Sequence, residues 1–287
     1  MKYDGVPTMV NFGVSIFPTD KTMQPVELAQ AVEERGFDSL FFPEHTHIPA
    51  SRDTPFPAGG DLPEHYWRSH DPFVALGAAA AVTNRIKLGT GICLVIERDP
   101  IQLAKECASL DVISEGRFIF GIGAGWNREE MENHGANYKQ RWKVVREKIL
   151  AMKTIWTEDE PEFHGEFVDF DPIWSWPKPV QAGGPPIWMG ANSKWTFDRV
   201  AEYCDGWMPI GGPGSGGIAN MKEAAEKRGR RFEDITLALF GAPNDAEQLN
   251  GRIEQGFSEL VFGLPQGNRD EVLATLDQYA KLVETAR

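Results

Sequence analysis

Two histidines one residue apart, His45 and His47, follow an apolar run at 39–42 that is typical of a β-strand. Side chains at positions i and i+2 of a strand share a face, so the pair has the spacing of two metal ligands. A metal site needs three or four ligands that converge from several strands. All six histidines precede residue 165, and the expected ends of three later strands ("GANS", "PIGG" and "GLPQ") carry no histidine or carboxylate. We therefore expect no metal site.

Glycine-rich stretches mark the expected ends of four neighbouring strands, namely "LGTGICL" at 88–94, "GIGAG" at 121–125, "MGANS" at 189–193 and "IGGPG" at 210–214. Trp126 stands where a dinucleotide-binding motif needs its last glycine or alanine. Gly217 and Ile218 stand where a phosphate-binding loop needs lysine and then serine or threonine. Together, the glycines remove side chains at neighbouring strand ends, which indicates room for a large flat ligand against the backbone.

An anionic group on such a ligand has a predicted place after the fifth strand. Backbone N–H groups at the start of a helix can bind phosphate without basic side chains. Here these groups would belong to Gly190, Ala191, Asn192 and Ser193, ahead of a helix expected from about residue 194. In the alternative interpretation, Asn192 or Ser193 only caps its own helix.

Apolar runs of strand length alternate with segments of helical period along the chain, which predicts parallel β-α units. The expected strands are 9–17, 39–42, 86–95, 117–124, 186–191, 206–210, 235–241 and 259–264. Two helices are expected to begin at Asp71-Pro72 and Asp99-Pro100, because the carboxylate can cap the helix and proline suits its first position. Eight such units in roughly 250 residues predict a (β/α)8 TIM barrel, with a doubly wound open sheet as the alternative.

We expect residues 1–287 to form one domain, because no stretch of the sequence reads as a linker. Two segments, 43–70 and 157–185, are longer than ordinary loops. Active sites of such barrels lie at the C-terminal ends of the strands. We therefore interpret both segments as insertions that cover that face.

The composition narrows the classes of partner. A formal net charge of −13 disfavours nucleic acid and anionic membranes. The start of the sequence lacks a signal-peptide pattern, and the longest run of small apolar residues is too short to span a bilayer, so a soluble, cytoplasmic protein with a small-molecule substrate is expected. The three cysteines are far apart and are expected to be reduced.

The chain resembles the luciferase-like flavin and deazaflavin oxidoreductases over about 200 residues taken in order. The resemblance runs through "NFGVSIFP", "GFDSLFFPEH", "IKLGTGICLVIERDPIQLAKECASLDVISEGRFIFGIGAGWNREEMENHG", "RWKVVREKILAMKTIW", "WPKPVQAGGPPIWMGANS" and "AEYCDGWMPIG". Within the family it is most similar to the branch that uses the deazaflavin coenzyme F420, with the FMN-dependent monooxygenases as the alternative.

The resemblance implies where the cofactor binds. The ring would lie across the barrel mouth near Glu44 and His45, and a non-prolyl cis peptide would join Gly91 to Ile92. The residues that it implies around the ring are Gly91, Ile92, Cys93, Gly123, Ala124, Gly125 and Trp126. Those implied around the phosphate are Gly190, Ala191, Asn192, Ser193, Gly211 and Gly212.

The resemblance also implies a reaction, a hydride transfer between coenzyme F420 and a small organic substrate. His45 is the expected catalytic proton handler, because histidine ordinarily titrates near pH 6.5. Glu44 either joins in proton transfer or only organises the site. Sugar-phosphate dehydrogenases of the branch carry a catalytic glutamate just after the fourth strand. This chain has Trp126 there, and Glu129 and Glu130 follow only further on.

This departure favours a flatter, less polar substrate. Trp126, Trp174 and Trp176 are the expected aromatic wall around it. A homodimer is expected from the resemblance and from "ALGAAAAV" at 75–82, whose small side chains let two helices approach closely.

Overall fold

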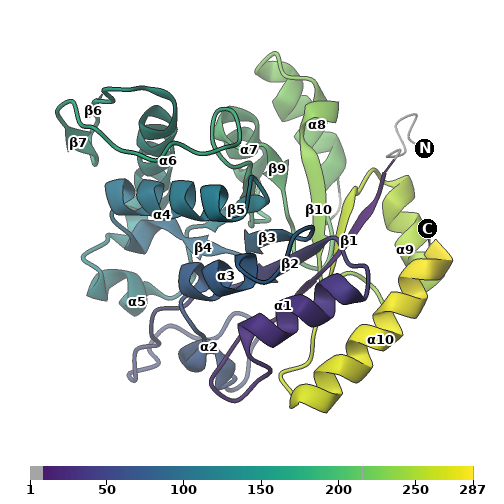
Figure 1. Ribbon diagram of the computed structural model, residues 1–287. Coiled ribbons are helices and arrows are strands. Elements are labelled where there is room, and N and C mark those ends of the chain that lie inside the picture. Colours follow the sequence, from purple (N-terminus) through teal and green to yellow (C-terminus); the bar gives the residue numbers. More distant parts are fainter. Residues whose placement is uncertain (1–8, 215, 287) are drawn as a thin grey trace.

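The computed structural model describes residues 9–214 and 216–286, and its strands close into a parallel barrel (Figure 1). The strand order is β3-β2-β1-β11-β10-β9-β8-β5-β4, and β3 also pairs with β5, which closes the sheet. Its strands are β1 (Asn11–Ser15), β2 (Ser39–Phe42), β3 (Lys87–Thr90), β4 (Cys93–Leu94), β5 (Phe118–Gly123), β8 (Ile187–Met189), β9 (Gly206–Trp207), β10 (Thr236–Phe240) and β11 (Glu259–Gly263). The predicted (β/α)8 barrel is confirmed, with β3 and β4 as two parts of the third predicted strand.

Helices surround the barrel, and their starts follow the expected capping chemistry. Asp71 accepts hydrogen bonds from the backbone N–H groups of Phe73 and Val74, and Asp99 does the same at the start of the next helix. The helices are α1 (Pro25–Glu34), α2 (His65–Arg68), α3 (Pro72–Ala80), α4 (Pro100–Ile113), α5 (Arg128–Asn133), α6 (Arg141–Thr157), α7 (Thr196–Tyr203), α8 (Gly217–Lys227), α9 (Ala246–Glu254) and α10 (Arg269–Ala286). Short 3-10 turns are η1 (Val95–Glu97), η2 (Tyr138–Gln140) and η3 (Phe232–Asp234). No helix in the described ranges is long and apolar enough to cross a membrane.

Two apolar layers hold the barrel together. The inner layer fills the barrel with Phe41, Ile119, Trp188, Met208, Ala238, Phe240 and Val261, and the larger outer layer lies between strands and helices. Both faces of each strand are therefore buried, as expected for parallel strands covered by helices. The inner packing is tight: a Cβ on Gly121 would lie 2.0 Å from the backbone oxygen of Thr90.

The two long insertions lie at opposite ends of the barrel (Figure 1). Residues 43–70 follow β2 and contain α2 at the C-terminal end of the strands. Residues 157–185 contain the hairpin of β6 (Phe163–His164) and β7 (Asp169–Phe170), and they run from α6 into β8. The expectation that both cover the active face is therefore wrong for 157–185, because a segment that leads from a helix into a strand reaches the N-terminal end of that strand. Gln181 confirms this placement, since its Nε2 donates to the oxygen of Phe118 at the start of β5.

Candidate active site

A pocket of about 660 Å³ opens at the C-terminal ends of the strands. Residues at or just after the ends of the barrel strands and residues of the 43–70 insertion line it, and most of the lining is apolar or glycine. They include Ser15, Ile16, Phe17, Glu44, His45, Tyr66, Gly91, Ile92, Gly123, Ala124, Gly125, Trp126, Gly190, Ala191, Ile210, Phe240, Gly241, Gly263 and Leu264. The volume lies within the usual range for small-molecule sites, roughly 300–1,000 Å³.

His45 lies in this pocket with its ring orientation fixed by a buried carboxylate. Its Nδ1 is 2.8 Å from Oε2 of Glu130 on α5, and the Glu130 side chain is 1% exposed. Because a carboxylate only accepts, this contact places a proton on Nδ1 and leaves Nε2 to exchange a proton with a ligand. Tyr66 and Trp126 flank the imidazole, with ring centroids 5.3 and 5.8 Å away. Burial raises the pKa of Tyr66 above its ordinary value, so this phenol stays protonated at neutral pH.

Glu44 lies beside His45 in the sequence, but both of its carboxylate oxygens accept hydrogen bonds from other residues. Its Oε2 accepts from the N–H of Leu94 at 2.6 Å, and its Oε1 accepts from Nε of Arg98 at 2.7 Å. Arg98 also pairs with Asp71 and Glu106. These contacts favour the organising role for Glu44, which joins the ends of β2 and β4, over a part in proton transfer.

The peptide between Gly91 and Ile92 is cis, as the family resemblance implied, and both residues line the pocket. Cys93 is fully buried in the outer layer and does not line the pocket, so its predicted place against the ring is wrong. Successive side chains of a strand point to opposite faces, which turns Cys93 away when Ile92 and Leu94 face the pocket.

The neighbouring glycines make room for a side chain of the protein itself. A Cβ on Gly123 would lie 2.6 Å from Cδ1 of Ile92, and a Cβ on Gly190 would lie 2.5 Å from Cγ2 of the same residue. A Cβ on Gly91 would meet Phe240 at 2.8 Å. Open space for a flat ligand therefore does not explain these three glycines by itself, because they also accommodate Ile92 and Phe240.

The three tryptophans expected around a substrate do not come together. Trp126 lines the pocket beside His45. Trp174 and Trp176 are 81% and 58% exposed and line a separate hollow with Asp159 and Glu160. They belong to the 157–185 insertion at the other end of the barrel, so the predicted aromatic wall of three is corrected to Trp126 together with Tyr66.

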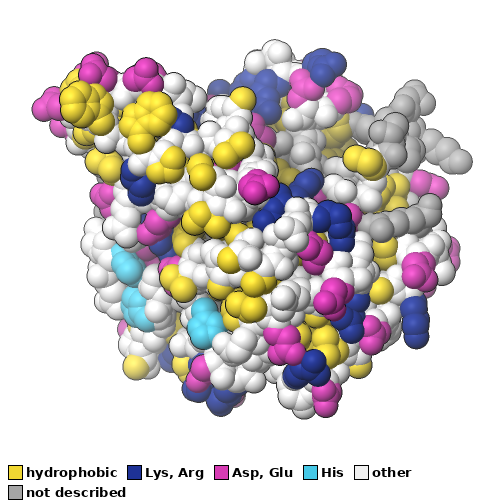
Figure 2. Space-filling model, viewed as in Figure 1, with side chains coloured by type: hydrophobic (Ala, Val, Ile, Leu, Met, Phe, Trp, Pro, Cys, Tyr) yellow, Lys and Arg dark blue, Asp and Glu magenta, His cyan; other side chains and the backbone are white. Residues whose placement is uncertain are grey.

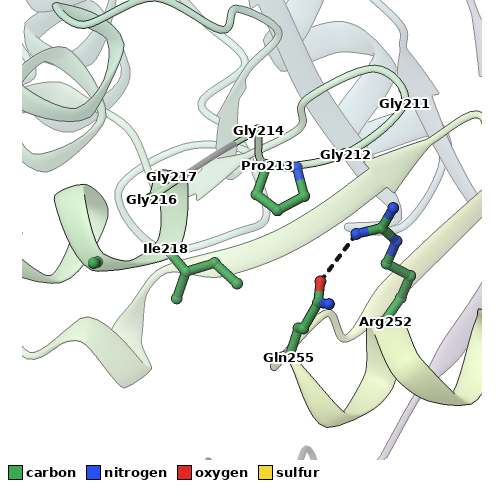
Figure 3. Close-up of a pocket in the computed structure, with 10 residues that line it drawn as sticks. Gly211, Gly212, Pro213, Gly214, Gly216, Gly217, Ile218, Arg252 and Gln255 are labelled. Atoms are coloured by element: carbon green, nitrogen blue, oxygen red, sulfur yellow. Dashed lines mark hydrogen bonds between the residues drawn. The ribbon is translucent and has the colours of Figure 1, made fainter. Parts of the chain in front are cut away.

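A second hollow, of about 450 Å³, adjoins the pocket where β9 ends (Figure 3). Gly211 and Gly212 line it, with Pro213, Gly214, Gly216, Gly217, Ile218, Ala219, Arg252 and Gln255. Arg252, on α9, faces Gly212: a Cβ on that glycine would lie 3.2 Å from Nη2 of the arginine. The N-terminus of α8 begins here at Gly217, so backbone N–H groups and a guanidinium face one hollow.

The four residues expected to bind phosphate after β8 separate into two pairs. Gly190 and Ala191 line the main pocket. Asn192 points to the second hollow, with Nδ2 3.4 Å from the oxygen of Gly212. The N–H of Ser193 donates to Oγ1 of Thr196, the first residue of α7, so it is already hydrogen-bonded. Neither Asn192 nor Ser193 is the N-cap of α7, which is Trp195.

Sequence reasoning missed Glu130 as the partner of His45, although a signal for it exists. Asn127 caps α5 by accepting from the N–H of Glu130, which is the spacing of a capping box. That pattern predicts a carboxylate at the first turn of a helix after β5, but not that it turns to His45. In the described residues no group of three or more histidine, cysteine or acidic side chains is arranged to hold a metal ion.

Comparisons with known proteins bear on the family and the fold. Residues 17–250 match the family model described as luciferase-like monooxygenase. An uncharacterized protein of Mycobacterium tuberculosis is 37% identical over 280 residues, which cover 94% of this chain and 98% of that protein. The F420-dependent glucose-6-phosphate dehydrogenase of Nakamurella multipartita is 28% identical over 222 residues, or 74% of this chain and 61% of that one. A solved F420-dependent secondary alcohol dehydrogenase, in complex with an F420-acetone adduct, has the same fold, with a TM-score of 0.76 at 17% identity over 98% of this chain and 100% of that chain.

Proposed function

The chain belongs to the luciferase-like monooxygenase family of redox enzymes, and we propose that it transfers a hydride between coenzyme F420 and a small organic substrate. The observation that carries the proposal is His45, held by Glu130 in an apolar pocket at the barrel mouth. Hydride transfer to or from an alcohol or enone needs one proton to be taken up or released beside it, and His45 is placed to handle that proton.

The residues present fit a flat cofactor with an anionic end. Ile92, Gly123 and Ala191 would lie along the ring, in a pocket lined mostly by apolar residues and glycines. The phosphate would lie in the second hollow, where Gly212 and the start of α8 supply N–H groups and Arg252 supplies positive charge. When bound, the deazaflavin supplies the carbon atom that gives or accepts the hydride.

The chain's own residues would orient the substrate and move its proton. Tyr66 and Trp126 form an apolar wall that excludes water beside His45, which strengthens polar interactions in the pocket. Glu130 holds the Nδ1 proton of His45, so Nε2 can accept a proton from a substrate hydroxyl during oxidation. In the opposite direction the protonated ring gives the proton back.

The alternative is an FMN-dependent monooxygenase, which the description of the family model favours. Titration of the purified protein with each oxidised cofactor, followed by fluorescence, separates the two. We expect tight binding of the deazaflavin. Tight FMN binding without a response to the deazaflavin would overturn the proposal, and screening alcohols, enones and nitroaromatics with the bound cofactor would then identify the substrate class.

His45→Ala tests the proton-handling role. The substitution should leave cofactor affinity within a few-fold and lower turnover about 10²- to 10⁴-fold, the usual contribution of a positioned acid or base. His164→Ala is the matched control, because this exposed histidine on β6 pairs with Asp169 at the other end of the barrel. Unchanged turnover in His45→Ala would remove His45 from the mechanism.

We also propose that the chain forms a homodimer through α3 and α4. Val74 on α3 and Ile113 on α4 are 74% and 56% exposed, and Figure 2 shows apolar side chains gathered over these two helices. Gly77 has open space where a Cβ would lie, which permits close approach of a second helix. Light scattering should give the mass of a dimer that Val74→Glu dissociates, and a wild-type monomer at micromolar concentration would contradict the proposal.

A further inference from the structure

A buried carboxyl group without a hydrogen-bond partner lies close enough to Glu130 for their charges to interact. Glu97 ends the 3-10 turn η1, its side chain is 1% exposed, and neither of its carboxyl oxygens has a hydrogen-bond partner. A buried carboxylate left unpaired costs several kcal/mol, so such a group is normally protonated or serves a function. Oε1 of Glu130 is likewise buried and unpartnered, although its Oε2 holds His45.

The surroundings keep a proton on Glu97. Burial, followed by the negative charges of Glu130 and Glu44, raises the pKa of Glu97 to about 9. Two cations, Arg98 and Lys148, also lie near Glu97, but both interact with other groups. Arg98 pairs with Glu44, and the Lys148 ammonium donates to the backbone oxygens of residues 95, 96 and 98. Glu97 is therefore a carboxylic acid at neutral pH.

A histidine that reaches the solvent lies beside Glu97. Nε2 of His134, just after α5, is 3.7 Å from Oε2 of Glu97, and the His134 side chain is 30% exposed. Burial, and after it the neighbouring His47, lowers the pKa of His134, so its ring is neutral at neutral pH and can accept a proton. Thr46 holds the ring through a hydrogen bond of 2.8 Å to the same nitrogen.

We propose that Glu97 is a buried proton carrier that links the His45–Glu130 pair in the pocket to His134 at the surface. This inference rests on the proposed function, because it supplies the outlet for the proton that His45 takes up. Glu97 and Glu130 do not touch the substrate, and both act through His45.

Each transfer moves one proton and breaks and forms only N–H and O–H bonds. During substrate oxidation, Glu97 gives its proton to His134, which releases it to water. The Glu97 carboxylate then accepts a proton from Glu130, which has received it from Nδ1 of His45. Because no hydrogen bond joins Glu97 to Glu130 or to His134, each of these steps needs a bridging water or a rotation of the carboxyl group. Substrate reduction runs the same steps in reverse.

The first test uses the protein without cofactor, so that it does not depend on the proposed function. Infrared spectra at pH 7 should contain the C=O stretch of a protonated carboxylic acid that Glu97→Gln removes. In the same variant, the pH dependence of the His45 ring signals in nuclear magnetic resonance spectra should change. Glu259→Gln is the matched control, a fully buried acid at the start of β11 whose pKa burial also raises. It should leave both the Glu97 infrared band and the His45 signals unchanged.

The second test measures turnover and its pH profile with bound deazaflavin. Glu97→Gln and His134→Gln should each lower turnover at least 10-fold while cofactor affinity stays within a few-fold, and Glu97→Asp should restore part of the rate. Because the two residues act in series, the double variant should be no slower than the slower single variant. Glu259→Gln should match the wild type.

Three results would overturn the proposal: no infrared band lost in Glu97→Gln, unchanged turnover and pH profile in that variant, or losses that multiply in the double variant. If the protein fails to bind or reduce the deazaflavin, the proposed function fails, but the measurements without cofactor still decide whether Glu97 holds a proton and is coupled to His45.

Discussion

The contact between Ile92 and Gly190 gives a quantitative test of how the pocket is built. A methyl group added by Gly190→Ala would lie 2.5 Å from Cγ2 of Ile92, about 1 Å short of an ordinary carbon–carbon contact of roughly 3.5–4.0 Å. Ile92 is β-branched and stiff, and Gly123 confines its other side, where a Cβ would lie 2.6 Å from Cδ1. The overlap therefore cannot relax cheaply, and we expect Gly190→Ala to lower the free energy of unfolding by about 1–3 kcal/mol.

A double-mutant cycle isolates that overlap. Ile92→Ala removes Cγ2 and should lower the free energy of unfolding by about 2 kcal/mol. This is the low end for such truncations, because Ile92 is only partly buried. If the clash is the cause, the double variant should be more stable than the sum of the two single effects predicts, by about 1–3 kcal/mol. Denaturant unfolding followed by circular dichroism measures all four proteins.

Gly263→Ala is the matched control for this cycle. Gly263 ends β11 in the same pocket, and nothing lies within 4 Å of the position of its Cβ. Its substitution should change stability by no more than about 0.5 kcal/mol. The reasoning is refuted if Gly190→Ala also falls within that limit, or if the effects of Gly190→Ala and Ile92→Ala add to within about 0.5 kcal/mol.

Two further predictions concern charges. Arg98→Met leaves the buried carboxylate of Glu44 without its cation, so it should lower the free energy of unfolding, measured with denaturant at pH 7, by about 3–5 kcal/mol. Arg35→Met removes a surface ion pair with Asp277 and should lower it by about 1 kcal/mol or less. A loss in Arg98→Met no larger than that in Arg35→Met would contradict this. Burial raises the pKa of Glu33, but bonds from the N–H groups of residues 84–86 outweigh it and the net shift is downward. Glu33 therefore stabilises the folded protein fully above about pH 4.5, its ordinary pKa, and this stabilisation is lost as the pH falls through its lower pKa in the folded protein. In Glu33→Gln, the melting temperature should depend less on pH in that acid range than it does in the wild type.

Much of the barrel was predictable because its signals are local. Strand-length apolar runs gave all eight strand positions, and the Asp-Pro pairs gave the starts of α3 and α4, since a cap and a first-turn proline act within four residues. The cis peptide at Gly91 came from the family resemblance rather than from any local pattern. The wrong placement of Cys93 could have been avoided from the local sequence, because side chains alternate along a strand and Cys93 points away from the pocket when Ile92 faces it.

The candidate site was only partly predictable, because its decisive contacts join distant segments. His45 and Glu130 are 85 residues apart, and Glu44 and Arg98 are 54 apart. No local pattern states which of several carboxylates will turn toward a given histidine or arginine. That choice depends on which strand ends lie side by side once the barrel has closed.

The alternation of strands and helices, the family, and a histidine at the end of β2 could all be inferred from the amino-acid sequence. The end of the barrel that each insertion covers, and the separation of Trp174 and Trp176 from Trp126, became known from the closed barrel. The closed barrel also decided that Glu44 is held by Arg98 while Glu130 holds His45. The physical reason is that backbone patterns depend on neighbours a few residues away, whereas the partner of a buried charge depends on the whole closed barrel.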